Sequence, residues 1–162
     1  METTSSTATG THPSQSAREL VISRVFDAPR ELVFKAWAEP ERWVHWLGLR
    51  GCSGKVLQTA RQPGDAYRYL MRDPEGGDHW LQGVFREFVE PERLVFTWGW
   101  ADEQWQPTDP ETVVTLTFED VGGKTRLTLR HGTFETVSAC DLHRAGWNGS
   151  FDRFGEYLAT AR

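Results

Sequence analysis

The chain has 162 residues and a formal net charge of −5, and its 8 Trp and 9 Phe are many for this length. The negative balance lacks the basic face that phosphate binding requires, so we expect no nucleic-acid partner. No apolar run could span a bilayer, and residues 1–17 lack a secretory signal pattern. We therefore expect a soluble, cytoplasmic protein.

Two cysteines, Cys52 and Cys140, lie far apart in the sequence. They form no disulfide framework and no C-x-x-C metal or redox signal, and the sequence leaves open whether the two thiols pair. No histidine pair has the spacing of a zinc motif, and the chain has no Gly-rich phosphate loop. We predict no metal site and no cofactor.

The N-terminal third is predicted to contain a tail, a strand and two short helices. Residues 1–17 are rich in Thr and Ser and are expected to be a disordered tail before one domain over 18–162. A strand is predicted over 20–26. Asp27 is the expected N-cap of the first helix, with Pro29 in its first turn. The second helix starts at Pro40 and carries Trp43 and Trp46, which we expect to be exposed, gating a cavity or joining two protomers.

Alternating polarity predicts six further strands, over about 55–59, 67–71, 78–89, 93–100, 112–118 and 125–131. Turn signals rich in Gly and Pro separate them, and 101–110 is expected to be a mobile loop. The inward register of 78–89 is ambiguous because Phe85 and Phe88 have opposite parity. A β-bulge near these residues would reconcile them.

The last segment, about 138–160, is predicted to be a long helix with one buried side. Ser138 is the expected N-cap. Gly146, Gly149 and Gly155 lie inside the helix, each costing about 1 kcal/mol relative to Ala. The helix must therefore be stabilised by what it packs on, and we expect Gly146 and Gly149 to let it approach the sheet closely. Its buried side consists of Cys140, Trp147, Phe151, Phe154 and Leu158.

The element order is β-α-α, six strands and a final helix, an α+β pattern with a curved, mainly antiparallel sheet of about seven strands wrapped on the long C-terminal helix. One face of the sheet is unusually aromatic. A curved sheet facing a glycine-containing helix would leave a cavity between them, and such cavities are ordinary ligand sites.

This order resembles the helix-grip fold of the START-like (Bet v 1-like, SRPBCC) superfamily, and local patterns resemble its branch related to the C-terminal domain of the activator of Hsp90 ATPase. The resemblance covers about residues 18–160. A departure is Trp46-Leu47-Gly48-Leu49, where the family often has two Trp followed by Gly-Pro, and it reshapes the cavity mouth. The patterns include Phe26-Asp27-Ala28-Pro29, Pro63-Gly64-Asp65, Gly83-Val84-Phe85-Arg86-Glu87-Phe88, Pro91-Glu92-Arg93-Leu94-Val95-Phe96-Thr97-Trp98, and His143 with Gly146-Trp147.

The inward aromatic rows predict binding of a small hydrophobic or aromatic molecule between sheet and helix, since Tyr and Trp supply apolar area and one polar group each. The alternative is that they form a plain core. The predicted lining residues are Trp46, Tyr67, Tyr69, Met71, Phe85, Phe96, Trp98, Trp100, Leu116, Leu129, His131, His143, Trp147 and Phe151.

Catalytic residues are not predicted, because the chain has no G-x-S-x-G and no nucleophile with an evident base and acid nearby. His131 and His143 could contact a ligand or transfer protons, or they could be structural histidines. Glu87 could face inward and would then need a partner or a raised pKa. These groups keep a cyclase- or hydrolase-like enzyme open as an alternative.

The resemblance also implies a possible contact with an Hsp90-type chaperone and a role in the stress response. Against this alternative, the chain is expected to be one domain, without the additional N-terminal domain of such co-chaperones. The sequence does not determine the ligand or the oligomeric state, and a homodimer stays open.

Overall fold

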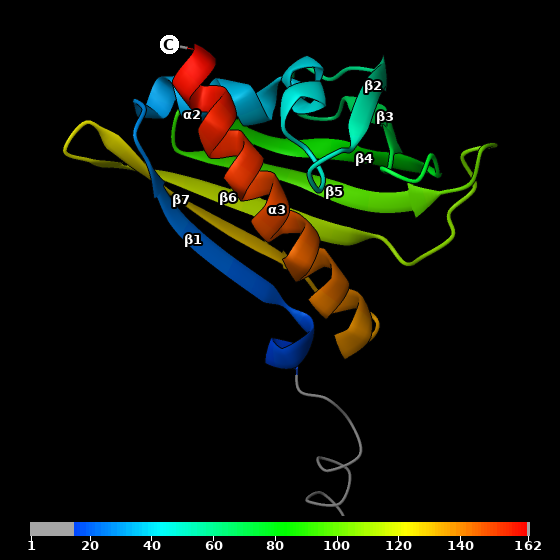
Figure 1. The fold of residues 1–162 in the computed structure, drawn as a ribbon. Coiled ribbons are helices and arrows are strands. Elements are labelled where there is room, and N and C mark those ends of the chain that lie inside the picture. The colour runs from blue at the N-terminus through cyan, green and yellow to red at the C-terminus, as the bar shows by residue number, and fades with distance from the viewer. Residues whose placement is uncertain (1–14, 162) are drawn as a thin grey trace, which may run out of the picture.

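The structure is a computed structural model and describes residues 15–161. The predicted tail lies outside those residues except for its last part, which forms the 3-10 helix η1. The remaining elements, with their labels in Figure 1, are β1, α2, η2, β2 to β7 and α3. Their bounds are η1 Gln15–Arg18, β1 Leu20–Phe26, α2 Arg30–Ala38, η2 Pro40–His45, β2 Ser53–Gln58, β3 Ala66–Arg72, β4 Asp78–Val89, β5 Arg93–Ala101, β6 Thr112–Val121, β7 Lys124–Gly132 and α3 Val137–Ala161.

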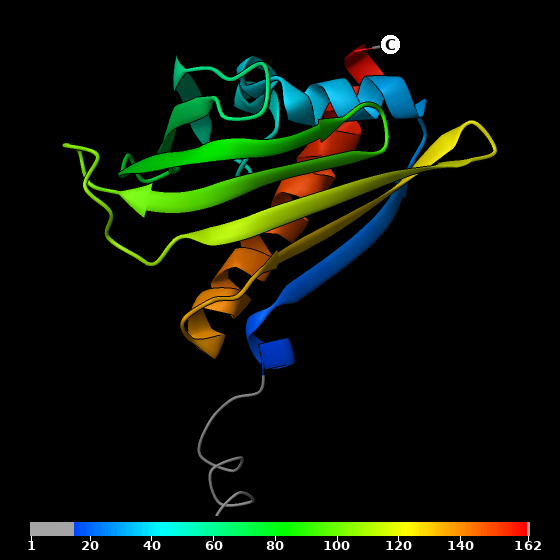
Figure 2. The same ribbon diagram turned by 180° about the vertical axis from the view of Figure 1, so that it is seen from behind.

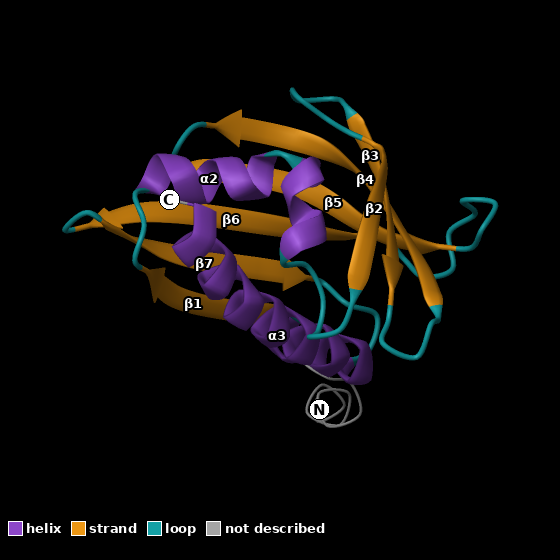
Figure 3. Ribbon diagram, turned by 45° about the horizontal axis from the view of Figure 1, so that its top comes forward, coloured by secondary structure: helices purple, strands orange, loops and turns teal. Residues whose placement is uncertain are grey.

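The seven strands form one antiparallel sheet in the order β1-β7-β6-β5-β4-β3-β2. The sheet curves around α3, which crosses its inner face diagonally, while α2 and η2 cover the same face near one end (Figures 1 and 3). Seen from behind, the strands lie in front of the helices, and no helix of residues 15–161 covers their outer face (Figure 2). The predicted helix-grip fold is confirmed.

Alternation along β6 and β7 shows why these residues form a half-buried sheet. Leu116 lies directly opposite Leu129 in the register, and both are fully buried. The intervening Thr117 is only partly buried, as expected where successive side chains point to opposite faces. Gly122 and Gly123 form the turn, and both adopt positive φ, which a glycine tolerates without steric cost. The predicted hairpin is therefore present.

The ambiguous strand contains the expected bulge. The pairing of β4 with β5 shifts between Phe85 and Glu87, and the shift brings Phe85 and Phe88 to the same face, with ring centroids 4.9 Å apart. Glu87 points outward and its Oε1 accepts a hydrogen bond from Arg93 Nε at 2.9 Å. The inward interpretation of Glu87 is therefore wrong, because the extra residue of the bulge reverses its parity.

Both predicted helix caps are wrong. Pro29, and not Asp27, occupies the N-cap position of α2. At α3 the Thr136 hydroxyl accepts a hydrogen bond from the Ala139 amide at 3.0 Å, and Ser138 lies inside the first turn. Two residues with good capping side chains stand two positions apart here, and sequence alone does not rank them.

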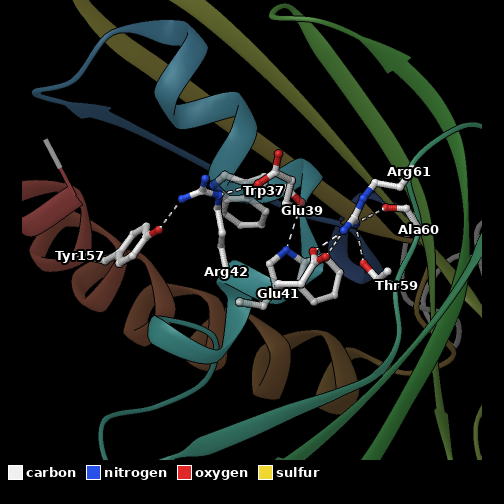
Figure 4. A network of polar contacts seen from close by, with 9 residues as sticks. Trp37, Glu39, Glu41, Arg42, Thr59, Ala60, Arg61 and Tyr157 are labelled. Carbon is white, nitrogen blue, oxygen red and sulfur yellow. Dashed lines mark hydrogen bonds and ion pairs between the residues drawn. The ribbon is translucent and has the colours of Figure 1, made fainter.

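The second predicted helix is the 3-10 helix η2, and its tryptophans are buried rather than exposed: Trp43 is 1% and Trp46 0% exposed. Trp43 Nε1 donates to the Trp37 carbonyl at 3.0 Å. Polar side chains tie η2 to its surroundings (Figure 4): Arg42 donates to Tyr157 of α3, and Arg61 pairs with Glu41. The prediction that this helix gates a cavity or joins two protomers assumed exposed tryptophans, and both tryptophans are buried.

The glycines of α3 do not bring it close to the sheet as predicted. A Cβ at Gly149 would lie 2.6 Å from Leu49 Cδ2, so the close approach is to the loop before β2. A Cβ at Gly146 would meet nothing within 4 Å, and one at Gly155 would be in ordinary contact with the Phe26 ring. Both cysteine thiols are free. No helix within residues 15–161 is long and apolar enough to cross a membrane.

Candidate functional site

An apolar hollow of about 380 Å³ lies between α3, β3, β5 and the loop that leads into β2. We call it the inner chamber. Side chains from β3, β4, β5, α3 and two connecting segments meet there. Its lining consists of Leu47, Gly48, Leu49, Cys52, Met71, Asp73, His79, Trp98, Trp100, Leu142, His143, Gly146, Trp147 and Ser150.

The loop wall of the inner chamber is fastened to α3 by two side chains. Ser150 Oγ accepts a hydrogen bond from the Gly48 amide at 2.7 Å. Arg153 Nη1 donates to the carbonyls of Leu47, Gly48 and Leu49 at 3.0, 3.3 and 3.1 Å, and its Nη2 donates to the Cys52 carbonyl at 3.4 Å. One guanidinium therefore sets the shape of the loop, since its five donors lie in a fixed fork.

Tryptophan rings form the sheet and helix walls of the chamber. The Trp98 ring centroid lies 4.9 Å from that of Trp147 and 5.6 Å from that of Trp100. Trp98 is 4% exposed, and within the described residues its indole Nε1 has no hydrogen-bond partner. Trp37 and Trp46 share this lack of a partner, but neither of them lines the chamber. Buried N–H groups without partners are unusual in native structures.

His131 lies behind this wall in a chain of hydrogen bonds. Trp147 Nε1 donates to His131 Nδ1 at 3.0 Å. Since an indole N–H can only donate, Nδ1 is unprotonated and Nε2 carries the proton. Nε2 lies 2.7 Å from Thr112 Oγ1, which donates in turn to the Trp98 carbonyl at 3.2 Å. Both ring nitrogens of the fully buried His131 are thus engaged.

His143 repeats this arrangement one turn earlier on α3. Trp100 Nε1 donates to His143 Nε2 at 2.8 Å, and His143 Nδ1 lies 2.8 Å from the Ala139 carbonyl. The two imidazole centroids are 5.3 Å apart. Burial lowers the pKa of His131 well below its usual value, and burial also lowers the pKa of His143, opposed by its bond to Ala139 and by the charge of Asp109. Both rings are therefore neutral and act as acceptors for tryptophans.

The structure brings five of the fourteen predicted lining residues together at the inner chamber: Met71, Trp98, Trp100, His143 and Trp147. The other nine lie in the solid core, packed under α2, η2 and the middle of α3 or behind the chamber wall. Tyr67, for example, is fully buried and donates to the Thr97 carbonyl at 2.6 Å. These nine are Trp46, Tyr67, Tyr69, Phe85, Phe96, Leu116, Leu129, His131 and Phe151.

Sequence reasoning missed the residues that close the chamber from the loop and the helix. Leu49 and Cys52 lie on an irregular segment without periodicity, so no pattern assigned them a face, whereas Leu47 was expected on the apolar side of the second helix with Trp43 and Trp46. Leu142 of α3 borders the chamber, but its side chain is 72% exposed, so it does not belong to the buried side of the helix. The one available signal was the departure from Gly-Pro after Trp46, which indicated a reshaped mouth.

A second hollow of about 850 Å³ adjoins the chamber, and we call it the outer groove. The two share His79, Trp98, Trp100, Leu142 and His143 in their linings. The groove extends between the loop after β5 and the start of α3, and it also contains Trp80, Thr112 and Phe134. Its carboxylates are those of Asp78, Asp102, Glu103, Asp109 and Glu135.

The lining of the inner chamber contains one carboxylate–histidine pair, in which His79 Nε2 lies 2.8 Å from Asp73 Oδ2. Over residues 15–161 no set of three or more His, Cys, Asp or Glu side chains could hold a metal ion. His131 and His143 converge, but protonating either acceptor nitrogen would remove a tryptophan hydrogen bond. Burial raises the pKa of the Cys52 thiol, which lowers its thiolate fraction. What the arrangement offers is a concave, aromatic binding surface.

Residues 27–159 match the family model described as activator of Hsp90 ATPase homolog 1-like protein. No curated protein matches the sequence.

Solved structures share the fold at low sequence identity. The chain is similar to a protein from Arthrobacter aurescens, with a TM-score of 0.82, 24% identity and coverage of 92% of this chain and 90% of that one. The AHSA1 protein from Silicibacter pomeroyi has a TM-score of 0.78, 24% identity and coverage of 89% and 99%. CalU16 from Micromonospora echinospora has a TM-score of 0.62, 21% identity and coverage of 86% and 75%. At these identities the likeness shows the fold alone.

Proposed function

We propose, from the premise that this chain belongs to the activator of Hsp90 ATPase homolog 1-like family, that it binds a small hydrophobic or aromatic molecule in the inner chamber. The observation that carries the proposal is the chamber itself, about 380 Å³ of apolar space walled by Trp98, Trp100 and Trp147. This volume lies within the range of about 300–1,000 Å³ that is typical of small-molecule sites.

The energetics support a ligand with a flat apolar body. Burying apolar surface contributes about 25 cal/mol per Å². Aromatic pairs in favourable geometry add about 0.5–1.5 kcal/mol beyond their area. The hydrogen bonds that engage both ring nitrogens of His131 and of His143 support a binding role for these two residues rather than proton transfer.

The test is calorimetric titration with 2-naphthylmethanol. For a ligand of about twelve heavy atoms at roughly 0.5 kcal/mol each, we expect a Kd of tens of micromolar. Gly146→Leu places a side chain where the helix borders the chamber, and it should weaken binding by at least about tenfold, the equivalent of about 1.4 kcal/mol.

Ala145→Leu is the matched control, because Ala145 is the preceding position of the same helix and is exposed. It should bind the probe as the wild type does. The proposal fails if the wild-type protein binds no 2-naphthylmethanol, or if the two variants bind it equally well.

A co-chaperone role remains an alternative from the family resemblance. No contact, charge or exposed surface in residues 15–161 favours it over ligand binding. Stimulation of the cognate chaperone's ATPase by the purified protein would establish it.

A further inference from the structure

The outer groove is strongly acidic and continues directly from the aromatic chamber. Among the described residues that line it, five are carboxylates and none is Lys or Arg. Two carboxylates are already engaged: Asp78 pairs with Arg72, and Asp102 accepts bonds from the amides of Gln104 and Gln106 in its own loop.

Glu103, Asp109 and Glu135 are different, since each is exposed and no ion pair with another residue of 15–161 compensates its charge. They come from two segments that both line the groove, the loop after β5 and the turn before α3. Like charges that line one hollow give it a negative potential, which concentrates cations there.

The wall shared by chamber and groove adds aromatic faces to this potential. Trp98 and Trp100 line both hollows, and indole faces attract organic cations electrostatically.

We propose that the ligand is an organic cation, an amine whose apolar body occupies the inner chamber and whose ammonium group lies in the outer groove near Glu103, Asp109 and Glu135. This inference rests on the proposed function and adds the charge of the ligand to it. The apolar body supplies affinity through burial, while the groove carboxylates favour the charged end and reject anions.

Three probes with one shared ring system separate these contributions. 2-Naphthylmethylamine is a cation at pH 7, 2-naphthylmethanol is neutral and 2-naphthoate is an anion. By calorimetry at low ionic strength, we expect the amine to bind roughly fivefold more tightly than the alcohol, and the carboxylate more weakly than both. Because the groove is open to water, raising the salt concentration should shrink the preference for the amine.

The test variant combines Glu103→Gln, Asp109→Asn and Glu135→Gln, and it should bind amine and alcohol about equally. The matched control combines Glu31→Gln, Glu90→Gln and Glu92→Gln, three exposed carboxylates outside both hollows, and changes the net charge by the same amount. It should keep the preference of the wild type.

The outcomes separate this inference from the proposed function. If the amine and the alcohol bind equally to the wild type and Gly146→Leu weakens both, the cation preference is refuted and the chamber stands. If the preference survives in the groove variant, the groove carboxylates are not its source and the inference is overturned. If no probe binds at all, both proposals fail.

Discussion

At the scale of single residues, two tryptophan–histidine hydrogen bonds decide the chemistry of the site. Trp147 and Trp100 donate to His131 and His143, so each imidazole serves as an acceptor and stays neutral. Thr112 then links His131 to the backbone of β5. Because every ring nitrogen has a partner, these histidines hold the chamber wall in place rather than presenting an acid or a base to a ligand.

This arrangement predicts a stability that falls on mild acidification. An imidazole in the unfolded chain has a pKa of about 6.5. Burial lowers the pKa of His131 well below that value in the folded protein. Below about pH 6.5 the unfolded state therefore binds more protons, and the free energy of unfolding decreases by up to about 1.4 kcal/mol per pH unit from His131. Burial also lowers the pKa of His143, so protonation of this residue decreases the free energy of unfolding in the same direction.

Urea unfolding at pH 7, 6 and 5 measures this slope. His131→Asn should flatten it, whatever its effect on stability at pH 7, because the titrating group is gone. In NMR titrations the ring signals of His131 should stay at their neutral positions over the same range. A wild-type stability that is level from pH 7 to pH 5 would contradict the prediction.

At the scale of elements, the close packing of β4 against its neighbours β3 and β5 depends on one glycine. A Cβ at Gly83 would lie 2.1 Å from the Thr97 carbonyl oxygen and 2.7 Å from Tyr67 Cε2. The same carbonyl accepts the Tyr67 hydroxyl at 2.6 Å, and the Thr97 hydroxyl accepts the Val84 amide at 2.8 Å. The missing side chain therefore lets three strands close together beside the bulge.

Gly83→Ala should consequently destabilise the protein by about 3 kcal/mol or more, because backbone atoms and a buried ring must both move. Gly99→Ala is the comparison: Gly99 lies on the neighbouring strand, where a Cβ would be 3.4 Å from the Gln82 carbonyl oxygen, an ordinary contact. It should change stability by less than about 1 kcal/mol. Denaturant unfolding of both variants gives the difference, and equal losses would show that the close approach is unimportant.

At the scale of the whole molecule, the sequence predicted the architecture well because the spacing of apolar residues within each helix or strand indicates its type and its buried face. Leu116, Leu129 and His131 alternate with polar neighbours, and Trp147 and Phe151 follow a helical spacing, so their buried faces could be read locally. The family match and the structure confirm the resemblance to the START-like superfamily.

The position of the hollow was harder to predict, since inward-facing residues of one sheet face line both the core and the chamber. Tyr67 on β3 and Trp98 on β5 are both inward-facing aromatics. Tyr67 lies under η2, with its ring centroid 5.1 Å from that of Trp43, whereas Trp98 faces the start of α3. Periodicity distinguishes inside from outside, but it does not distinguish a core from a cavity.

The loop from 47 to 52 connects these scales, because one side chain of α3 determines its course. Arg153 donates to four carbonyls between Leu47 and Cys52, and the loop forms one wall of the inner chamber. Arg153→Met keeps the aliphatic stem and removes every donor. We expect it to destabilise the protein by about 1–2 kcal/mol, since bonds to a charged donor contribute more than neutral ones but these carbonyls can regain water.

We expect the loop wall of the inner chamber to become more mobile, while the protein as a whole loses little stability. Amide hydrogen exchange of Gly48, which donates to Ser150, should accelerate in Arg153→Met, and binding of 2-naphthylmethanol should weaken several-fold. Arg50→Met is the control, because the ion pair that Arg50 makes within the described part of the chain is with Glu156, an exposed residue of the same helix. It should leave exchange and binding near wild type, as exposed ion pairs contribute little. If Arg153→Met accelerated exchange at Gly48 without weakening the probe, the loop would not be a binding wall, and the ligand would be held by the sheet and α3 alone.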